Sequence, residues 1–317
     1  MLSAIVLALR AGGPGAQAAA ASLALALTWA FIGPHYAATY RRAYSSRAIV
    51  RAHPWVTLAA PPLLLAAAAL AVRYPYGFGL VYFGAYVAGT GYHYSGQTLG
   101  LALLYPLRQG APLDRVEKRL LAAPLYVSWL LTLVALFGEL QPGRNAAFAF
   151  VRGVYQGPPV PTWAWLAGLG VLAATLAGVA SVAVRRARRG TPLPAPTYAV
   201  LATQLLWFTV GVQHPVLNTT LVPVFHAIQY LAFTGWHAYR APARPPWQRL
   251  AYFVVPTALL GLAIFPGSFN FFTRGRPYLD MFFMTAAVAT FLNLHHFLLD
   301  GRIWRMREPS VARSMLA

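Results

Sequence analysis

Nine stretches of this chain are predominantly apolar over about 20 residues, the length that an α-helix needs to cross the hydrocarbon core of a bilayer. They span approximately 17–40, 53–72, 78–106, 119–139, 163–184, 196–213, 215–239, 249–269 and 279–301. Inside lipid the backbone must satisfy its own hydrogen bonds, which favours helices for runs of this length. We therefore expect an all-α, polytopic transmembrane helical bundle of about nine helices, with residues 1–317 forming a single integral membrane domain.

Composition and charge exclude a soluble enzyme. Hydrophobic residues make up 58% of the chain and charged residues only 10%, well below the quarter or so that is usual for a soluble domain. The formal net charge of +19 would suit nucleic acid if the basic residues formed one folded face. They lie instead in short blocks between apolar runs, such as Arg41-Arg42 and 185–189, so we exclude nucleic acid and expect the lipid bilayer as the partner. The absence of cysteine excludes thiolate metal sites.

The positions of the basic residues predict the orientation in the membrane. With the N-terminus outside, 19 of the 25 Lys and Arg residues fall in loops or tails on the cytoplasmic side and 6 fall outside. Cytoplasmic loops carry an excess of Lys and Arg, so the N-terminus is expected outside and the C-terminus inside. This distribution is typical of a multi-pass protein of a bacterial-type inner (cytoplasmic) membrane. The sequence shows no internal repeat, so one compact bundle is expected.

Five histidines within the apolar windows are the candidate metal ligands. His35, His93, His226 and the pair His295-His296 fall on the first, third, seventh and ninth windows. Ionisable side chains at bilayer depth are costly and mark functional sites by default. These four helices are all expected to run from outside to inside, and the histidines lie in their central to cytoplasmic parts, so the imidazoles could meet in one layer. Hydrogen bonds to neighbouring helices are the alternative role for each histidine.

Three polar residues accompany these histidines at helical spacing. Gln97 follows His93 by four residues, Tyr230 follows His226 by four, and Asp300 follows His296 by four. Residues four apart share one face of a helix, so these side chains are candidate catalytic or orienting groups. Asp300 in particular can orient an imidazole through its second nitrogen.

The ligand types restrict the metal. Imidazole suits Fe, Zn, Cu and Ni alike, so spacing alone does not select one. A carboxylate-bridged di-iron bundle needs several inward glutamates, which six acidic residues in the whole chain do not supply. A redox reaction would require an open iron or copper site, whereas a structural zinc is closed and four-coordinate. Fe(II) is the metal expected first, with Zn or Cu as alternatives.

Short patches around these residues resemble the Brp/Blh family of membrane β-carotene dioxygenases. The residues that match are Pro34, His35, His93, His226, His295 and Asp300. Thr39 stands where the family has an acid, and Tyr230 where it has a second histidine. The resemblance implies a helical membrane bundle in which histidines hold one non-haem iron that uses dioxygen to cleave carotene. It favours His295 as the ligand, whereas the spacing to Asp300 favours His296.

These observations lead to one functional hypothesis and a rival. The hypothesis is a membrane-embedded non-haem metal oxygenase, with iron as the metal, that acts on a lipophilic substrate such as an isoprenoid or a lipid. The rival is a non-enzymatic membrane protein in which the histidines are structural: a transporter, a haem-binding electron carrier or an accessory subunit. A haem protein would be distinguished by its absorption spectrum, and a transporter by paired repeats or broken helices.

Overall fold

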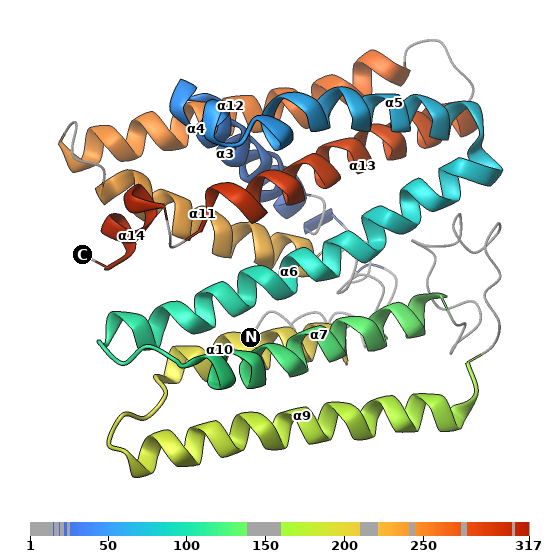
Figure 1. The fold of residues 1–317 in the computed structure, drawn as a ribbon. Coiled ribbons are helices and arrows are strands. Elements are labelled where there is room, and N and C mark those ends of the chain that lie inside the picture. Colours follow the sequence, from blue (N-terminus) through green and yellow to red (C-terminus); the bar gives the residue numbers. More distant parts are fainter. Residues whose placement is uncertain are drawn as a thin grey trace. The chain divides into compact units, whose positions relative to one another are not determined.

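The computed structural model describes residues 15, 19, 22–23, 26–137, 160–209, 221–240, 245–273, 278–305 and 308–316. Within these residues every regular element is a helix and no strand occurs (Figure 1). The all-α prediction is therefore confirmed for this part of the chain.

Each predicted apolar window overlaps a helix, and the helices extend beyond several windows. The π-helical turn η1 (Thr28–Ile32) leads into α3 (Gly33–Tyr44), η2 (Trp55–Ala59) into α5 (Ala60–Arg73), and η3 (Pro75–Gly79) into α6 (Leu80–Arg108). The later windows correspond to α7 (Arg115–Phe137), α9 (Thr162–Arg188), α10 (Ala195–Phe208), α11 (Val222–Arg240), α12 (Pro246–Thr273) and α13 (Tyr278–Ile303). Two short helices, α4 (Arg47–Ala52) and α14 (Pro309–Leu316), lie outside the windows.

Three of the described helical segments are long and apolar enough to cross a membrane. They are Trp55–Arg73, Arg115–Ala135 and Thr162–Arg188, with mean hydropathies of 2.0, 1.3 and 2.0. These segments indicate membrane association. The total number of crossings and the orientation of the termini stay predictions.

Close contacts divide the chain into two compact units. Unit 1 contains residues 1–89 together with 219–315, and unit 2 contains 90–218. The division falls inside the continuous helix α6, between Gly89 and Thr90.

In unit 1, α3 packs against α11, α12 and α13, and α5 packs against α13. Polar contacts accompany the apolar ones. The Tyr36 hydroxyl donates to Asn293 Oδ1 at 2.5 Å, which joins α3 to α13. Arg41 donates to the Phe253 carbonyl at 3.0 Å and so joins α3 to α12. Because α3 contacts three other helices, its side chains lie at the centre of unit 1.

In unit 2, two helix-ending turns have the same backbone form. Gly110 ends α6 with φ 71° and Gly190 follows α9 with φ 73°, the left-handed conformation that favours glycine. Arg186 joins the two turns, because its guanidinium donates to the carbonyls of Ala111 at 2.6 Å and Thr191 at 3.1 Å. The same guanidinium forms a buried ion pair with Glu117 at 2.8 Å.

Glu117 also helps to begin α7. Its carboxylate accepts the Asp114 backbone N–H at 3.0 Å, while Asp114 Oδ1 accepts the Glu117 N–H at 2.8 Å, which is a reciprocal capping box. The bond from the Glu117 N–H holds the pKa of the Asp114 carboxyl below its usual value.

The core of unit 2 reveals an internal repeat that inspection of the sequence missed. Six of its seven buried residues form pairs 80 positions apart: Ala102 with Val182, Leu113 with Leu193, and Leu121 with Leu201. The two glycines of the turns, Gly110 and Gly190, have the same offset. The hairpin α6–α7 therefore recurs as α9–α10, and the expectation of no internal repeat is corrected. Little of the sequence is shared besides Gly-x-Pro-Leu at each turn, because burial rather than residue identity is repeated.

Candidate metal centre

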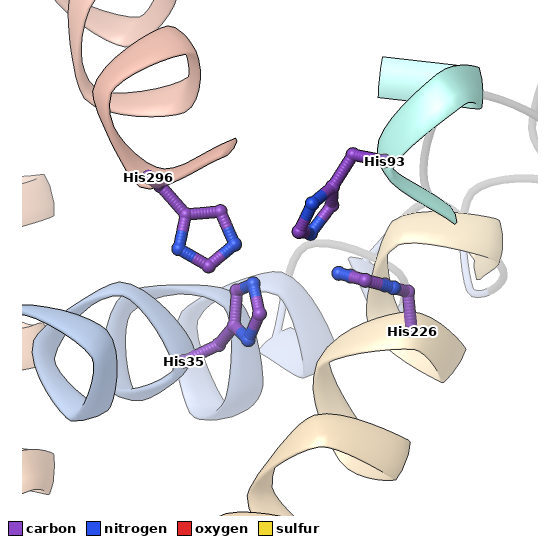
Figure 2. Close-up of side chains that lie close together, drawn as sticks. All are labelled: His35, His93, His226 and His296. Carbon is purple, nitrogen blue, oxygen red and sulfur yellow. The ribbon is translucent and has the colours of Figure 1, made fainter. Parts of the chain in front are cut away.

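Four histidines from four helices converge on one point. His35 comes from α3, His93 from α6, His226 from α11 and His296 from α13, and their rings point toward one another (Figure 2). One ring nitrogen of each lies within 4.8 Å of those of the other three. Four nitrogens bound tetrahedrally to one ion at about 2.1 Å would be about 3.4 Å apart. Side-chain rotations that bring the ring nitrogens about 1.4 Å closer together would therefore complete a metal site.

Three imidazoles of this cluster are removed from solvent, and His93 is partly buried. His35 and His226 are each 3% exposed and His296 is fully buried. The His35 ring lies edge to face against both His226 and His296, with centroids 5.0 and 4.3 Å apart. Neutral imidazoles in an apolar surrounding present nitrogen lone pairs without the competition of bulk water. The donor set therefore fits a divalent transition-metal ion.

A second layer of polar side chains lies one helical turn along from the histidines. Thr39, Tyr230 and Asp300 follow His35, His226 and His296 by four residues each, and all three are buried. Asp300 Oδ1 accepts hydrogen bonds from the Thr39 hydroxyl at 2.9 Å and from the Tyr230 hydroxyl at 3.0 Å. The other carboxylate oxygen, Oδ2, lies 3.3 Å from His296 Nε2.

With an ion bound, this layer would supply the negative charge that the histidines lack. Four neutral imidazoles leave the full charge of a divalent ion uncompensated, so a nearby carboxylate lowers the cost of burying it. Asp300 has this position, since it contacts a histidine of the cluster through one oxygen and two hydroxyls through the other. The cluster therefore has four imidazoles with a carboxyl group beside one of them.

The structure separates the predicted catalytic residues by role. The Tyr230 hydroxyl contacts Thr39, Asp300 and Trp304, which places it in the second layer and not among the ring nitrogens of the cluster. Asp300 lies beside His296, as the four-residue spacing predicted. Gln97 is half-buried on α6, one turn from His93. Thr39 and Tyr230, the two departures from the Brp/Blh pattern, contact each other directly.

His295, which the family resemblance favoured as the ligand, faces away from the cluster. Its Nε2 lies 2.9 Å from the Val56 carbonyl oxygen and its Nδ1 lies 3.3 Å from the Tyr40 hydroxyl. Because a carbonyl only accepts, Nε2 carries the proton in this contact. The preference for His295 is therefore corrected, and His296 is the member of the pair that joins the cluster. The physical reason is that adjacent residues on a helix point about 100° apart.

A proline explains why His295 is needed at this position. In the π-helical turn η2 the Ala60 N–H bonds to the Trp55 carbonyl, so it does not reach Val56. The next residue, Pro61, has no N–H to donate. The Val56 carbonyl therefore lacks a helical donor, and His295 supplies one from α13. A buried carbonyl without a donor would cost about 1–3 kcal/mol.

Sequence reasoning missed the residues that fix the second layer. Thr39 entered only as the replacement of an acid, yet it donates to Asp300. Trp304 was not considered, although its Nε1–H donates to the Tyr230 hydroxyl at 2.7 Å. The available signal was spacing, because Thr39 lies four residues beyond His35, and Trp304 lies four residues beyond Asp300.

The remaining histidines lie outside the cluster or outside the described residues. His237 has its ring nitrogens 2.6 Å from Arg42 and 2.6 Å from Ser314. His53 lies 3.7 Å from the Glu308 carboxylate. His214 lies in a part of the chain that the structure does not describe.

Comparisons with known proteins add no relative to this description. No protein-family model matches the chain, and no curated protein or solved structure matches it either.

Proposed function

We propose that this protein is a membrane-embedded non-haem metalloenzyme, an iron oxygenase that acts on a lipophilic substrate. The observation that carries the proposal is the convergence of His35, His93, His226 and His296 from four separate helices. Packing alone does not require four imidazoles with mutually close nitrogens, since a single cross-helix hydrogen bond satisfies a buried histidine. A shared ion accounts for all four at once.

The proposed reaction, and not the donor set, selects iron over a purely structural zinc. Four imidazoles close a tetrahedral zinc shell, whereas iron accepts further ligands beyond four, and when bound here it would supply dioxygen activation. In this proposal the protein's own residues do the rest. The four imidazoles hold the ion, and Asp300 fixes the orientation of His296. The buried surroundings exclude water from His35, His226 and His296.

The membrane setting and the resemblance support a lipophilic substrate. A chain with 58% hydrophobic residues offers few charged groups to bind a polar substrate. The Brp/Blh-like patches point to isoprenoids as one class. The second layer differs from that family at Thr39 and Tyr230, so we propose the substrate class and not carotene itself.

The contacts within each unit support the proposed topology, with the C-terminus inside. In unit 2, Arg186 joins the α6–α7 turn to the α9–α10 turn, so these two basic loops share one end. In unit 1, Arg42 near the end of α3 contacts His237 near the end of α11 and the Ile303 carbonyl at the end of α13. The C-terminal ends of α3, α11 and α13 therefore also lie together, as expected if the first, seventh and ninth spans run in the same direction. Both groupings agree with cytoplasmic loops rich in arginine in a multi-pass inner-membrane protein.

Metal analysis tests the proposal directly. The protein purified in detergent after iron-supplemented expression should contain about one ion per chain, and His93→Ala or His226→Ala should reduce this at least tenfold while the helical circular dichroism is kept. His53→Ala is the matched control, because His53 pairs with Glu308 outside the cluster, and it should leave the metal content unchanged. Less than about a tenth of an ion in the wild type would refute the proposal. A Soret band in the same sample would favour the haem-binding rival.

A further inference from the structure

The second layer contains more contacts than its hydroxyl protons can serve. Thr39 and Tyr230 each have one hydroxyl proton, but their oxygens and Asp300 Oδ1 form three mutual contacts. If both protons point to Asp300, the Thr39–Tyr230 contact has no donor. If either hydroxyl donates to the other instead, Asp300 loses one of its two donors. The arrangement therefore has two kinds of state, in which either two protons or one proton face the carboxylate.

Trp304 selects between these two states. Its Nε1–H is 2.7 Å from the Tyr230 hydroxyl oxygen, and an indole nitrogen can only donate. This bond occupies an acceptor position of the Tyr230 oxygen. A donor from Thr39 would have to share this oxygen with Trp304. The bond from Trp304 also makes the Tyr230 O–H a stronger donor, and a carboxylate is a better acceptor for it than the Thr39 hydroxyl. The contact with Trp304 therefore favours the state in which both protons face Asp300.

The indole is itself held in place from three sides. The Arg42 guanidinium lies 4.0 Å from the ring centroid. The rings of Phe233 and His237 pack edge to face against it, with centroids 5.1 and 5.3 Å away. Arg42 in turn contacts His237 and the Ile303 carbonyl. These contacts restrict the rotation of the indole, so its N–H has a fixed direction toward Tyr230.

We propose that Trp304 is a positioning residue of the metal centre, which acts through Tyr230 to direct two hydroxyl protons onto Asp300 Oδ1 and so leaves Oδ2 for His296. The proposal rests on the proposed metal-binding function and deepens it. It does not make Trp304 a ligand or a catalytic residue, because the indole contacts Tyr230 and not the histidine cluster.

A double-mutant cycle with Co(II) as the probe tests this role in the full-length protein in detergent. Trp304→Phe keeps an aromatic ring against Arg42 but removes the N–H. It should weaken Co(II) binding by about 10-fold, the effect typical of a lost outer hydrogen bond at a metal site, and shift the visible Co(II) spectrum. In a Tyr230→Phe background the same change should alter the affinity less than about 2-fold, because the hydroxyl through which Trp304 acts is absent. Trp236→Phe, on the more exposed face of α11, is the matched control and should bind Co(II) as the wild type does.

Each outcome decides the matter. Unchanged affinity and spectrum in Trp304→Phe would overturn the proposal, and so would an equal loss in both backgrounds, since Trp304 would then act by packing alone. If Trp304→Phe does not fold, Tyr230→Phe alone serves, and wild-type affinity in that variant overturns the proposal. These outcomes would overturn only the role of Trp304 and would not contradict the proposed metal centre. Absence of Co(II) binding in the wild type, in contrast, would refute the metal centre and this role together.

Discussion

Gly33 of α3 and Gly261 of α12 approach so closely that neither position has room for a side chain. A Cβ on Gly33 would lie 2.5 Å from the Gly261 carbonyl oxygen, and a Cβ on Gly261 would lie closer still to the backbone of Gly33 and Pro34. Backbone atoms cannot move aside as a flexible side chain can. Because His35 follows two residues after Gly33, this contact fixes the position of one ligand helix.

Gly261→Ala should therefore displace α3 and disturb the metal centre. We expect destabilisation of at least about 1–3 kcal/mol from overpacking and a marked loss of metal content. Gly301→Ala is the matched control, since a Cβ there meets nothing within 4 Å, and it should be neutral or slightly stabilising. Thermal unfolding in detergent and metal analysis measure both effects. Normal metal content in Gly261→Ala would show that the close contact does not position His35.

Asp300→Asn should weaken the metal centre without unfolding the protein. The amide has the shape of the carboxylate but not its charge, so it does not compensate the charge of the ion. It has only one acceptor oxygen, so it cannot accept from the two hydroxyls on one side and face His296 with a second oxygen on the other. We expect metal affinity to fall about 10- to 100-fold. Glu308→Gln is the control, because that carboxylate is partly exposed and pairs with His53. Equal metal affinity in the two variants would contradict the role given to Asp300.

His295 should matter for stability and not for metal binding. His295→Leu removes the donor to the Val56 carbonyl and should cost about 1–3 kcal/mol, with metal content unchanged. Pro61→Ala restores a backbone N–H that can reach this carbonyl. The cost of His295→Leu should therefore be smaller in the Pro61→Ala background, which unfolding measurements on the four proteins of the cycle would detect. If His295→Leu lowers the free energy of unfolding equally in both backgrounds, His295 does not compensate for the N–H that Pro61 lacks.

The ion pair between Arg186 and Glu117 should stabilise unit 2 independently of the metal centre. Glu117→Ala leaves a buried guanidinium without its carboxylate, which typically costs about 3–5 kcal/mol. Arg185→Ala changes a neighbouring arginine outside this ion pair and should have little effect. Unfolding temperature should fall in the first variant while metal content, measured at a temperature where both are folded, stays at the wild-type value.

Much of the fold class and part of the site follow from the sequence for clear reasons. Apolar length predicts helices because lipid permits little else, and every predicted window overlaps a described helix. The histidine helices were identified because an imidazole is conspicuous in an apolar run. Four-residue spacing then placed Asp300 beside His296 correctly, since this relation is local to one helix.

The remaining features depend on contacts between helices. Whether His295 or His296 joins the cluster is set by the rotation of α13 about its axis. In this rotation His295 reaches the Val56 carbonyl, which lacks a helical donor. Trp304, directly after the end of α13, donates a hydrogen bond to Tyr230 of α11, and spacing along one helix does not reveal such a contact. The hairpin repeat escaped notice because its residues match in burial and not in identity.

The repeated hairpins of unit 2 are alike in their cores and unlike in chemistry. The offset of 80 residues that pairs their buried positions carries His93 onto Ala173 and Gln97 onto Ala177. Both alanines are exposed on α9, where a small apolar side chain suits contact with lipid. One copy of the same architecture thus contributes a histidine to the cluster, whereas its twin has alanine at that position. The difference lies in single residues that the shared hairpin fold does not dictate.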